Sequence, residues 1–511
     1  MTPEPNVDRS SLIRGLGIVA AVSVIIGNII GTGVFLKARV MTCNVGSPGW
    51  VITAWVAAGL LSLAGALTYA ELTAMRPVAS AQNVFLEESY GKPLSFLFGW
   101  MQILIARPGS QAAAAVAFAI GLNDFLDNKL AQSLFRWNVY TNPFSIDTIK
   151  TLEVATADGK HLAYSFELTT LSLVAVMVIV IFTTLNCASV MLAGRIASAL
   201  TFVKIALIVF VAGGAFVLVS GDFVHFSQIA TGGACEGVAE NVKYGSASYS
   251  FLGGFAAAML GALWGYDGWD NLTFVAGEVK EPGKNIPRAI IGSMFLIIVL
   301  YVIAQVAYFY VLDPTTIASV SKNSSIAKTV VSMFFGGNVA SMATGVAVAF
   351  FTVGLMLSSL GTLHTSLMAA GRIPYRMARE RLLFSVFGKL SVNHVPVSSV
   401  LLTGFLAAIL ALIGSFDTLT DYVVFAMWIF YALITGAIFV YRRKFPHLER
   451  PYRAWGYPVV PVIFLLVAAW LIYRTIVDSP TNSITGIVLI LLGLPAYWYF
   501  SKRGSGTAEE E

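Results

Sequence analysis

This sequence has few charged residues for its length. Only 12% of its 511 residues are charged and 57% are hydrophobic, whereas a typical soluble domain carries roughly 25% charged residues. A soluble protein of this length needs a polar shell around its core, and this composition does not supply one. We therefore expect an integral membrane protein whose surroundings are mostly lipid.

Cysteine, histidine and clustered charge are also scarce. The chain has three cysteines and five histidines, too few and too scattered for a metal cluster or a disulfide scaffold. The net charge is only +5, and no run of like charge indicates a nucleic-acid partner. The sequence shows no Walker loop, no Ser-His constellation and no paired catalytic carboxylates. It therefore predicts neither an enzyme nor a bound metal or cofactor.

Long apolar runs make up most of what is present. Twelve segments are long enough to cross a ~30 Å hydrocarbon core at about 1.5 Å per residue. The first is longer than a signal-peptide core and no small-residue cleavage site follows it, so we expect it to be retained. The predicted spans are 15–38, 49–72, 94–123, 168–188, 193–219, 249–277, 288–312, 334–370, 396–414, 420–441, 458–474 and 484–500.

Basic residues fall unevenly between the loops. About twice as many lysines and arginines lie on the side of the N-terminus as on the opposite side, and the positive-inside rule then places both termini in the cytoplasm. The expected location is the cell membrane, which in a bacterium is the inner membrane.

The order of spans predicts how the chain is divided. We expect a cytoplasmic tail, a first group of five helices, a second group that extends to about residue 441, two peripheral helices and a second cytoplasmic tail. These parts cover residues 1–14, 15–219, 220–395, 442–500 and 501–511, in that order.

Two segments between spans are unusual. The external loop 124–167 is long and contains β-prone stretches such as 150–155, so it is expected to form a small external cap. The segment 372–393 carries five basic residues and is interpreted as an amphipathic cytoplasmic helix, or equally as a simple anchor of the topology.

Glycine interrupts two of the spans. The first contains three glycines within seven residues (27–33, GNIIGTG), and the sixth contains two around an aspartate (264–270, WGYDGWD). Each glycine weakens a helix by roughly 1 kcal/mol relative to alanine. In lipid that weakness is tolerated only where the freed backbone faces protein or a water-filled cavity. Freed N–H groups suit a carboxylate and freed carbonyls suit an ammonium, the two charged groups of an amino acid.

The alternative reading is that these glycines only allow close helix packing. One such cluster would fit that reading. Two clusters placed five spans apart instead predict two five-helix repeats of opposite topology, with a binding site where the repeats meet.

These segments carry a family resemblance. Residues 26–35 (IGNIIGTGVF) resemble the first-helix signature of the amino acid–polyamine–organocation superfamily. Residues 265–271 (GYDGWDN), 277–282 (GEVKEP) and 285–290 (NIPRAI) are similar to the sixth-helix segment of its L-type amino acid transporter branch. Residues 77–83 depart from the family, which usually has a Gly-Gly pair and an aromatic residue there.

The resemblance implies a fold and a binding site. The fold is all-α and leucine-transporter-like, with a 5+5 inverted repeat, discontinuous first and sixth helices and two peripheral helices. The first four of the expected substrate-binding residues would hold the carboxylate and part of the amine. The backbone of the others would complete the ammonium site, and Trp264 would act as an aromatic gate. These residues are Ile29, Gly31, Thr32, Gly33, Trp264, Gly265, Asp267 and Gly268.

Two ionisable residues in the spans are functional candidates, because charge inside a bilayer is costly. Lys204 lies mid-span and is expected to reach freed carbonyls of the first span and the hydroxyls of Ser358 and Ser359. Sodium-coupled relatives hold a sodium ion at that place, so the lysine resembles sodium-independent members and is an ion mimic or a proton-coupling group. Asp267 favours substrates with cationic side chains, or else caps the half-helix that follows it.

Partners are expected to be few. L-amino acids and membrane lipid are the predicted partners, and the assembly is expected to be a monomer or a homodimer. Because the loop 124–167 has no cysteine, the disulfide-linked heavy chain of animal relatives is not expected to attach there. Cys43 and Cys235 both fall in external segments, so the sequence allows a disulfide between them without requiring it.

The resemblance favours one function and leaves others open. The expected function is sodium-independent exchange of L-amino acids by alternating access, with cationic as well as neutral substrates. Proton-coupled symport of cationic amino acids or polyamines is the main alternative. A transporter-like sensor would normally carry an added signalling domain, and a channel is disfavoured because two central breaks suit one occluded site.

Overall fold

The computed structural model describes most of the chain. The described residues are 16–78, 80–127, 129–130, 132–141, 154–155, 161–188, 191–337, 341–391 and 395–506. The expected N-terminal tail 1–14, the last five residues of the C-terminal tail and much of the loop 124–167 lie outside them.

The expected all-α membrane architecture is confirmed. By length and composition, ten helices in the described residues can cross a membrane. The shorter apolar helix α16 and the interrupted helix α10 complete the twelve expected spans. In span order the elements are α1 (Ile18–Ile29) with α2 (Gly33–Leu36), α4 (Pro48–Met75), α6 (Lys92–Met101) with η1 (Gln102–Ala106) and α7 (Arg107–Phe125), α8 (Thr170–Ala188), α9 (Met191–Leu218), α10 (Phe251–Tyr266) with η5 (Trp269–Glu278), α11 (Pro282–Val311), α14 (Met342–Ala370), α16 (Val397–Ile413), α17 (Phe416–Lys444), α18 (Val459–Asp478), and α19 (Pro480–Leu491) with α20 (Gly493–Gly506).

The packing partners of these helices show the inverted repeat. α1 packs on α11 as α10 packs on α4, and α9 packs on α14 as α17 packs on α7. Likewise α8 contacts α14, and α16 contacts α7. These three contacts of helices in the first group of five each have a counterpart in which the two groups exchange roles. The first and sixth spans therefore occupy equivalent places at the centre of the bundle.

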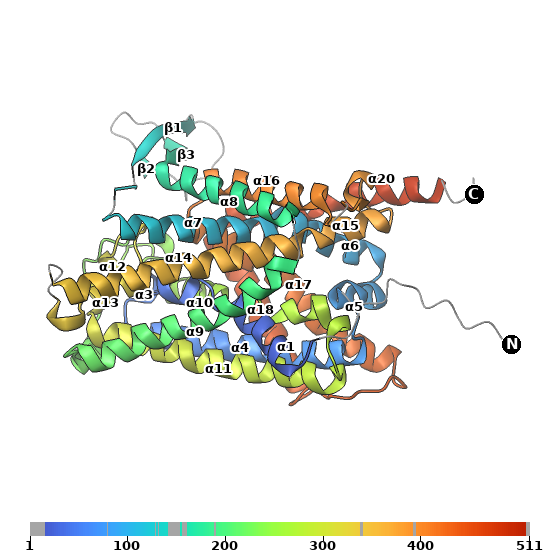
Figure 1. The fold of residues 1–511 in the computed structure, drawn as a ribbon, viewed down its shortest axis with the longest axis horizontal. Helices are drawn as coiled ribbons and strands as arrows, with labels where there is room; N and C mark the ends of the chain where they lie inside the picture. The colour runs from blue at the N-terminus through green and yellow to red at the C-terminus, as the bar shows by residue number, and fades with distance from the viewer. Residues whose placement is uncertain are drawn as a thin grey trace.

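Short elements close the two ends of the bundle (Figure 1). At one end, called here the sheet end, β1 (Ser133–Thr141) and β3 (His161–Thr169) pair antiparallel, and β2 (Val154–Ala155) pairs with β3. This sheet confirms β-structure in the long loop. The short helices α3 (Ala38–Val45), α12 (Pro314–Ser319) and α13 (Ile326–Ser332) lie at the same end, and α5 (Ala81–Tyr90) and α15 (Arg372–Arg379) lie at the opposite end.

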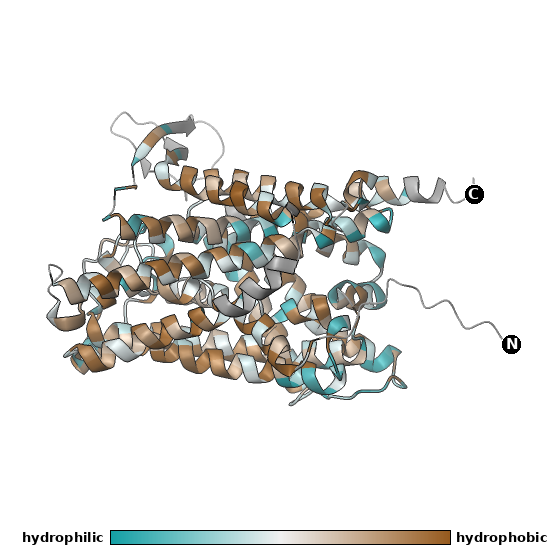
Figure 2. Ribbon diagram, viewed as in Figure 1, coloured by the Kyte–Doolittle hydropathy of each residue, from teal (hydrophilic) through white to brown (hydrophobic). Residues whose placement is uncertain are grey.

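Apolar side chains dominate the length of the bundle. Figure 2 shows hydrophobic residues along the outer helices and hydrophilic residues gathered at the end that holds α5 and α15. Large apolar side chains such as Phe202, Phe350 and Leu466 are exposed on the outside, which is the pattern of a surface solvated by lipid. The chain is thus a multi-pass membrane protein.

Two sequence expectations about helix bounds are wrong. Within the described residues 372–391 of this segment, the α-helix covers only Arg372–Arg379, because Arg381 has a left-handed backbone (φ 60°) that ends it. The short 3₁₀ helix η7 (Ser385–Gly388) follows. The eighth span starts at Met342 rather than near residue 334. Gly336 and Gly337 both have positive φ, so the chain turns there instead of continuing a helix.

Covalent and ionic bonds hold the loops to the bundle. Cys43 of α3 and Cys235 form a disulfide, which decides the question that the sequence left open. At the opposite end the buried carboxylate of Glu71, on α4, accepts hydrogen bonds from Arg442 Nε (3.0 Å) and Nη2 (2.7 Å). It also accepts one from the backbone N–H of Ala454 (2.6 Å). Glu71 therefore fastens α17 and the chain after it to α4.

Replacing Glu71 tests this anchor. Glu71→Gln leaves the partly buried guanidinium of Arg442, which is 23% exposed, without its counter-charge. The loss of one partner costs up to about 3–5 kcal/mol where both are buried. We expect the Tm of the purified protein in detergent to fall by several degrees. The matched control is Glu240→Gln, because the Glu240 side chain is 68% exposed in its pair with Lys243 and such pairs contribute about 0–1 kcal/mol. Equal Tm values for the two variants would contradict the anchoring role.

Candidate functional site

The first span loses its helical hydrogen bonds at its centre. α1 ends at Ile29, Ile30 has an extended backbone (φ −70°, ψ 91°), and α2 begins again at Gly33. Among the hydrogen bonds of the described residues, none engages the backbone N–H of Gly31, Thr32 or Gly33. These three donors point out of a broken helix at the N-terminal end of α2, where a negative group is stabilised.

The freed carbonyls of this break have side-chain partners on neighbouring helices. Tyr301 Oη donates to the carbonyl of Ile29 (3.0 Å) and Gln305 Nε2 donates to that of Val34 (3.4 Å). Both donors belong to α11, and both are fully buried. The break is therefore held by the seventh span, whose polar side chains replace the missing main-chain donors.

The sixth span breaks in the same way. α10 ends at Tyr266, Asp267 is extended (φ −62°, ψ 144°), and Gly268 has φ 107°, a conformation that other residues adopt only with strain. The chain continues as the 3₁₀ helix η5. The discontinuity expected in both spans is thus confirmed.

Glycine also lets the two breaks touch. A Cβ added to Gly33 would lie 2.8 Å from the Cα of Gly265, and one added to Gly268 would lie 3.2 Å from the carbonyl carbon of Asn28. The backbones of the two spans are therefore in direct contact at two points. Any larger residue at either point would push the broken segments apart.

Lys204 bridges the first and eighth spans beside the break. Its Nζ donates to the carbonyl of Gly27 (2.7 Å) and to Thr362 Oγ1 (2.8 Å), and its side chain is 1% exposed. The expected contact with a freed carbonyl of the first span is present.

The expected hydroxyl partners of Lys204 are corrected by the structure. The hydroxyl in contact is that of Thr362, one helical turn beyond Ser358. Ser359 donates instead to the carbonyl of Leu355 (2.8 Å), and the hydroxyl of Ser358 has no partner in the described part of the chain. Ser358 and Thr362 are four residues apart, so they lie on the same face of α14 at different heights along the helix axis. Only Thr362 is at the height of the Lys204 ammonium group.

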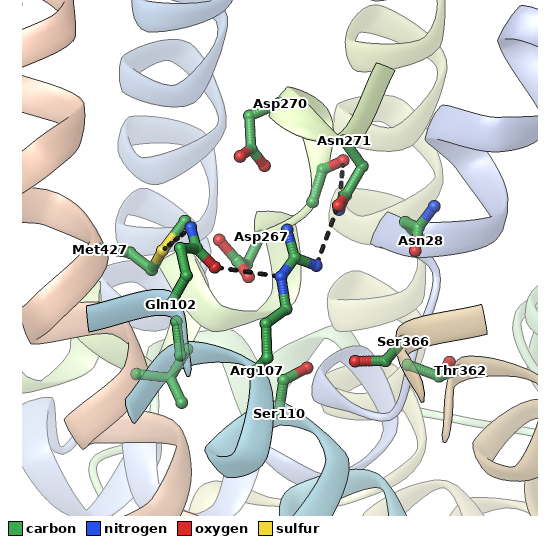
Figure 3. Close-up of a pocket in the computed structure, with 13 residues that line it drawn as sticks. Asn28, Gln102, Arg107, Ser110, Asp267, Asp270, Asn271, Thr362, Ser366 and Met427 are labelled. Carbon is green, nitrogen blue, oxygen red and sulfur yellow. Dashed lines mark hydrogen bonds between the residues drawn. The ribbon is translucent and has the colours of Figure 1, made fainter. Parts of the chain in front are cut away.

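A polar pocket lies where the two breaks meet (Figure 3). Side chains from the first, third, sixth, eighth and tenth spans line it, so both repeats contribute. Of the expected substrate-binding residues, Asp267 and Gly268 line this pocket, and the others lie along the breaks beside it. The lining residues are Asn28, Gln102, Ala106, Arg107, Ser110, Asp267, Gly268, Asp270, Asn271, Thr362, Ser366, Val423 and Met427.

A π-helical turn aims two of these side chains into the pocket. Pro108 has no N–H and its ring clashes with a preceding carbonyl, and directly before it η1 takes the wider π form that is frequent at functional sites. Arg107 then donates from Nε to Gln102 Oε1 (3.0 Å) and from Nη1 to Asn271 Oδ1 (3.1 Å). Its guanidinium lies 4.8 Å from the ring centre of Phe274.

Two carboxylates share one tyrosine beside Arg107. Tyr431, on α17, has its hydroxyl 2.8 Å from Asp267 Oδ1 and 3.1 Å from Asp270 Oδ1. Asp270 Oδ2 also accepts from Gln82 Nε2 (2.8 Å). Arg107 forms no ion pair with either carboxylate in the described part of the chain. Figure 3 shows that Asp267 nevertheless lies beside the guanidinium.

Gln82 lies in the segment that departs from the family pattern. Ser80, at the start of α5, has a left-handed backbone (φ 52°), which glycine adopts without strain. Its N–H donates to the carbonyl of Phe274 (3.2 Å). The departure from Gly-Gly thus leaves the local geometry in place and adds an amide that reaches the sixth span.

Ionic contacts close the sheet end above the breaks. Trp264 faces Phe416 edge to face, with ring centres 6.4 Å apart. Beyond it the buried Lys37 Nζ lies 2.8 Å from Asp417 Oδ1 and 3.6 Å from Asp421 Oδ1, and Arg39 lies 3.2 Å from Asp417 Oδ2. These ion pairs tie the segment from α2 to α3 to the start of α17 at the sheet end.

Sequence reasoning missed several residues of this site. Tyr431, Gln82 and Thr362 were not singled out, and neither was the pair of Lys37 with Asp417. The one local signal for them is a polar stripe in span ten, where Asp417, Tyr431 and similar residues interrupt an apolar run. Their partners lie more than 150 residues away in the sequence.

Comparisons with known proteins agree with this geometry. The amino acid permease family model matches residues 16–498. The chain is 27% identical to the b(0,+)-type amino acid transporter 1 of mouse, over 99% of this chain and 92% of the relative. It is 27% identical to the human cystine/glutamate transporter (97% and 87%) and to the rabbit large neutral amino acids transporter small subunit 2 (96% and 80%).

The contact between the breaks gives a test of the site geometry. Gly33→Ala would place a methyl group against the backbone of Gly265, and overpacking of this kind costs about 1–3 kcal/mol. We expect a lower Tm in detergent. Gly292→Ala, on the exposed face of α11, is the control, because a Cβ there meets nothing within 4 Å and alanine favours the helix. A Gly33→Ala variant as stable as the Gly292→Ala variant would show that the breaks are not in contact.

Proposed function

The chain belongs to the amino acid permease family and is an amino acid transporter, and we propose that it exchanges L-amino acids across the cell membrane without sodium. The observation that carries the proposal is the paired break, which offers unpaired N–H groups and freed carbonyls at one place. Alternating access then requires that this place open to one side of the membrane at a time.

The substrate backbone is proposed to bind at the breaks. Its carboxylate would accept hydrogen bonds from the free N–H groups of Gly31, Thr32 and Gly33, while the carbonyl of Ile29 would take part of the ammonium group. The backbone of Trp264, Gly265 and Asp267 would complete the ammonium site. Main-chain groups recognise the part that all amino acids share, so this arrangement leaves the side chain to be selected elsewhere.

Sodium independence is proposed from Lys204. Its ammonium group donates hydrogen bonds to the carbonyl of Gly27 and to a hydroxyl of the eighth span. Oxygen atoms of this kind are the ligands that a small cation such as sodium would coordinate. A protonated lysine at this place supplies the positive charge itself. The carrier then needs no bound metal ion to hold the first and eighth spans together.

The pocket is proposed to accept both neutral and cationic side chains. Its apolar lining comes from Ala106, Val423 and Met427, and its acidic lining from Asp267 and Asp270. Proton-coupled symport of cationic amino acids or polyamines stays the second candidate, because the same two carboxylates favour it.

Closure at the sheet end fits one stage of an exchange cycle. Lys37 and Arg39 join the first span to Asp417 of the tenth, so these contacts must separate before a substrate enters from that end. We propose that the sheet end faces the outside and that both termini lie in the cytoplasm, as the basic loops indicate.

No disulfide-linked partner chain is proposed. Cys43 and Cys235 are bonded to each other, and Cys187 lies partly buried on α8. The chain has only these three cysteines, so none is left in an external segment. A monomer or a homodimer is the proposed assembly.

Counterflow in proteoliposomes tests exchange. An exchanger reorients slowly when empty, and a barrier about 1.4 kcal/mol higher slows that step tenfold. We expect uptake of labelled leucine to be at least about tenfold faster into vesicles filled with unlabelled leucine than into empty ones. Imposed sodium and pH gradients should leave the leucine rate unchanged. Accumulation of leucine or lysine in empty vesicles, driven by a proton gradient alone, would instead establish the symport alternative.

Lys204→Ala tests the ion-mimic role. The change leaves the carbonyl of Gly27 and the hydroxyl of Thr362 without their donor, and a hydrogen bond from a charged group contributes about 1.5–3 kcal/mol. We expect leucine exchange to slow by tenfold or more. Lys243→Ala, which alters an exposed loop pair, should exchange at the wild-type rate. Wild-type kinetics in Lys204→Ala would remove the ion-mimic role.

A further inference from the structure

The sixth-span break holds two carboxylates that the exchange mechanism does not require. Asp267 and Asp270 flank the turn at Gly268 and both line the pocket. The side chain of Asp270 is 1% exposed, and Asp267 keeps part of its surface open to the pocket. A zwitterionic substrate backbone needs neither carboxylate, because the breaks already supply its donors and acceptors.

The hydroxyl of Tyr431 cannot serve both carboxylates when both are ionised. A phenol carries one hydrogen and donates one hydrogen bond, yet Oη lies 2.8 Å from Asp267 and 3.1 Å from Asp270. A hydrogen bifurcated between two anions would weaken both contacts, whereas both are full hydrogen bonds if one carboxyl group carries a proton and donates it to Oη. The geometry is therefore that of a chain from one carboxyl through the phenol to the other carboxylate.

The charged groups around the hydrogen bonds that join Asp267, Tyr431 and Asp270 also favour one protonated carboxyl group. Two side chains face these hydrogen bonds. Arg107, on α7, donates to two neutral amides, and Tyr69, on α4, has its ring 6.0 Å from that of Tyr431. One guanidinium balances one of the two carboxylates. A second, uncompensated charge inside the membrane costs at least ~2.5–3.5 kcal/mol, and two neighbouring carboxylates resist ionising together.

We propose that Asp267 and Asp270 share one proton through Tyr431, and that this proton is released when a substrate with a cationic side chain binds and is kept when the side chain is neutral. On release, the proton passes to water in the compartment that the pocket faces. The carboxylate left behind pairs with the guanidinium or ammonium group of the substrate. The pocket and its substrate together thus carry the same net charge with either kind of substrate. This proposal rests on the exchange function proposed above.

Exchange between unlike substrates must then move protons. When arginine enters and leucine leaves, the carrier returns outward with its proton, so one proton exits for each arginine that enters. The positive charge of arginine is balanced and the exchange is electroneutral. Exchange of leucine for leucine moves no proton.

The transport test uses proteoliposomes that contain leucine and a pH-sensitive dye. Adding arginine outside should make the lumen more alkaline, with one proton leaving per labelled arginine taken up, and clamping the voltage with potassium and valinomycin should not change the rate. In Asp270→Asn the amide donates to Tyr431 Oη and removes the need for a shared proton. That variant should show no pH change and should carry one positive charge inward per arginine. Asp222→Asn, in an external loop cap, is the matched control and should behave as wild type.

A second measurement does not depend on transport. Infrared difference spectra of the purified protein at neutral pH should show the carbonyl band of a buried protonated carboxyl group, present in Asp222→Asn and absent in Asp270→Asn. If wild type lacks the band, or if arginine–leucine exchange is electrogenic without a pH change, the shared proton is wrong and exchange stands. If the band is present but counterflow fails, the proton site stands and exchange is wrong.

Discussion

Everything in this structure depends on main-chain hydrogen bonds that are given up in the middle of two membrane helices. In lipid an unpaired N–H or C=O costs several kcal/mol, so a broken helix survives only where other protein groups replace the lost partners. The replacements are polar side chains buried in apolar helices: Tyr301 and Gln305 on α11 and Lys204 on α9. They satisfy carbonyls and leave N–H groups unpaired. The free N–H groups of the first break therefore suit an anionic group, while a carbonyl that accepts one hydrogen bond can still accept a second.

The inverted repeat explains why these supports converge. A single broken helix would face lipid on one side, but two related breaks placed together shield each other. The contacts of Gly33 with Gly265 and of Gly268 with Asn28 bring the two backbones close enough for that. The same closeness prevents any side chain from filling the space between them. A pocket lined by both repeats follows from packing two weakened helices against each other.

The local features of the site were predictable from the sequence, and the long-range pairings were not. Glycine density predicted both breaks, since the cost of glycine in a helix is a local property. The burial cost of charge singled out Lys204 and Asp267. Thr362 was missed in favour of Ser358 and Ser359, because its position depends on how α14 is rotated against α9. The bridge from Tyr431 to Asp267 and Asp270 spans more than 160 residues, and no periodicity in the sequence indicates such a pair.

Asp417 at the sheet end and the pair of Asp267 and Asp270 at the sixth-span break differ in the groups that they contact. At the sheet end, Asp417 has two fixed cations within ion-pair distance, Lys37 and Arg39, and a contact of this kind is either made or broken. At the sixth-span break, Asp267 and Asp270 hydrogen-bond to a phenol and an amide, and in the described part of the chain neither forms an ion pair with the nearby Arg107. A fixed ion pair there would exclude a cationic side chain, because the carboxylate would already be neutralised. The proposed movable proton would neutralise the pair only until a competing cation arrives, so the phenol bridge suits a site that takes both neutral and cationic side chains.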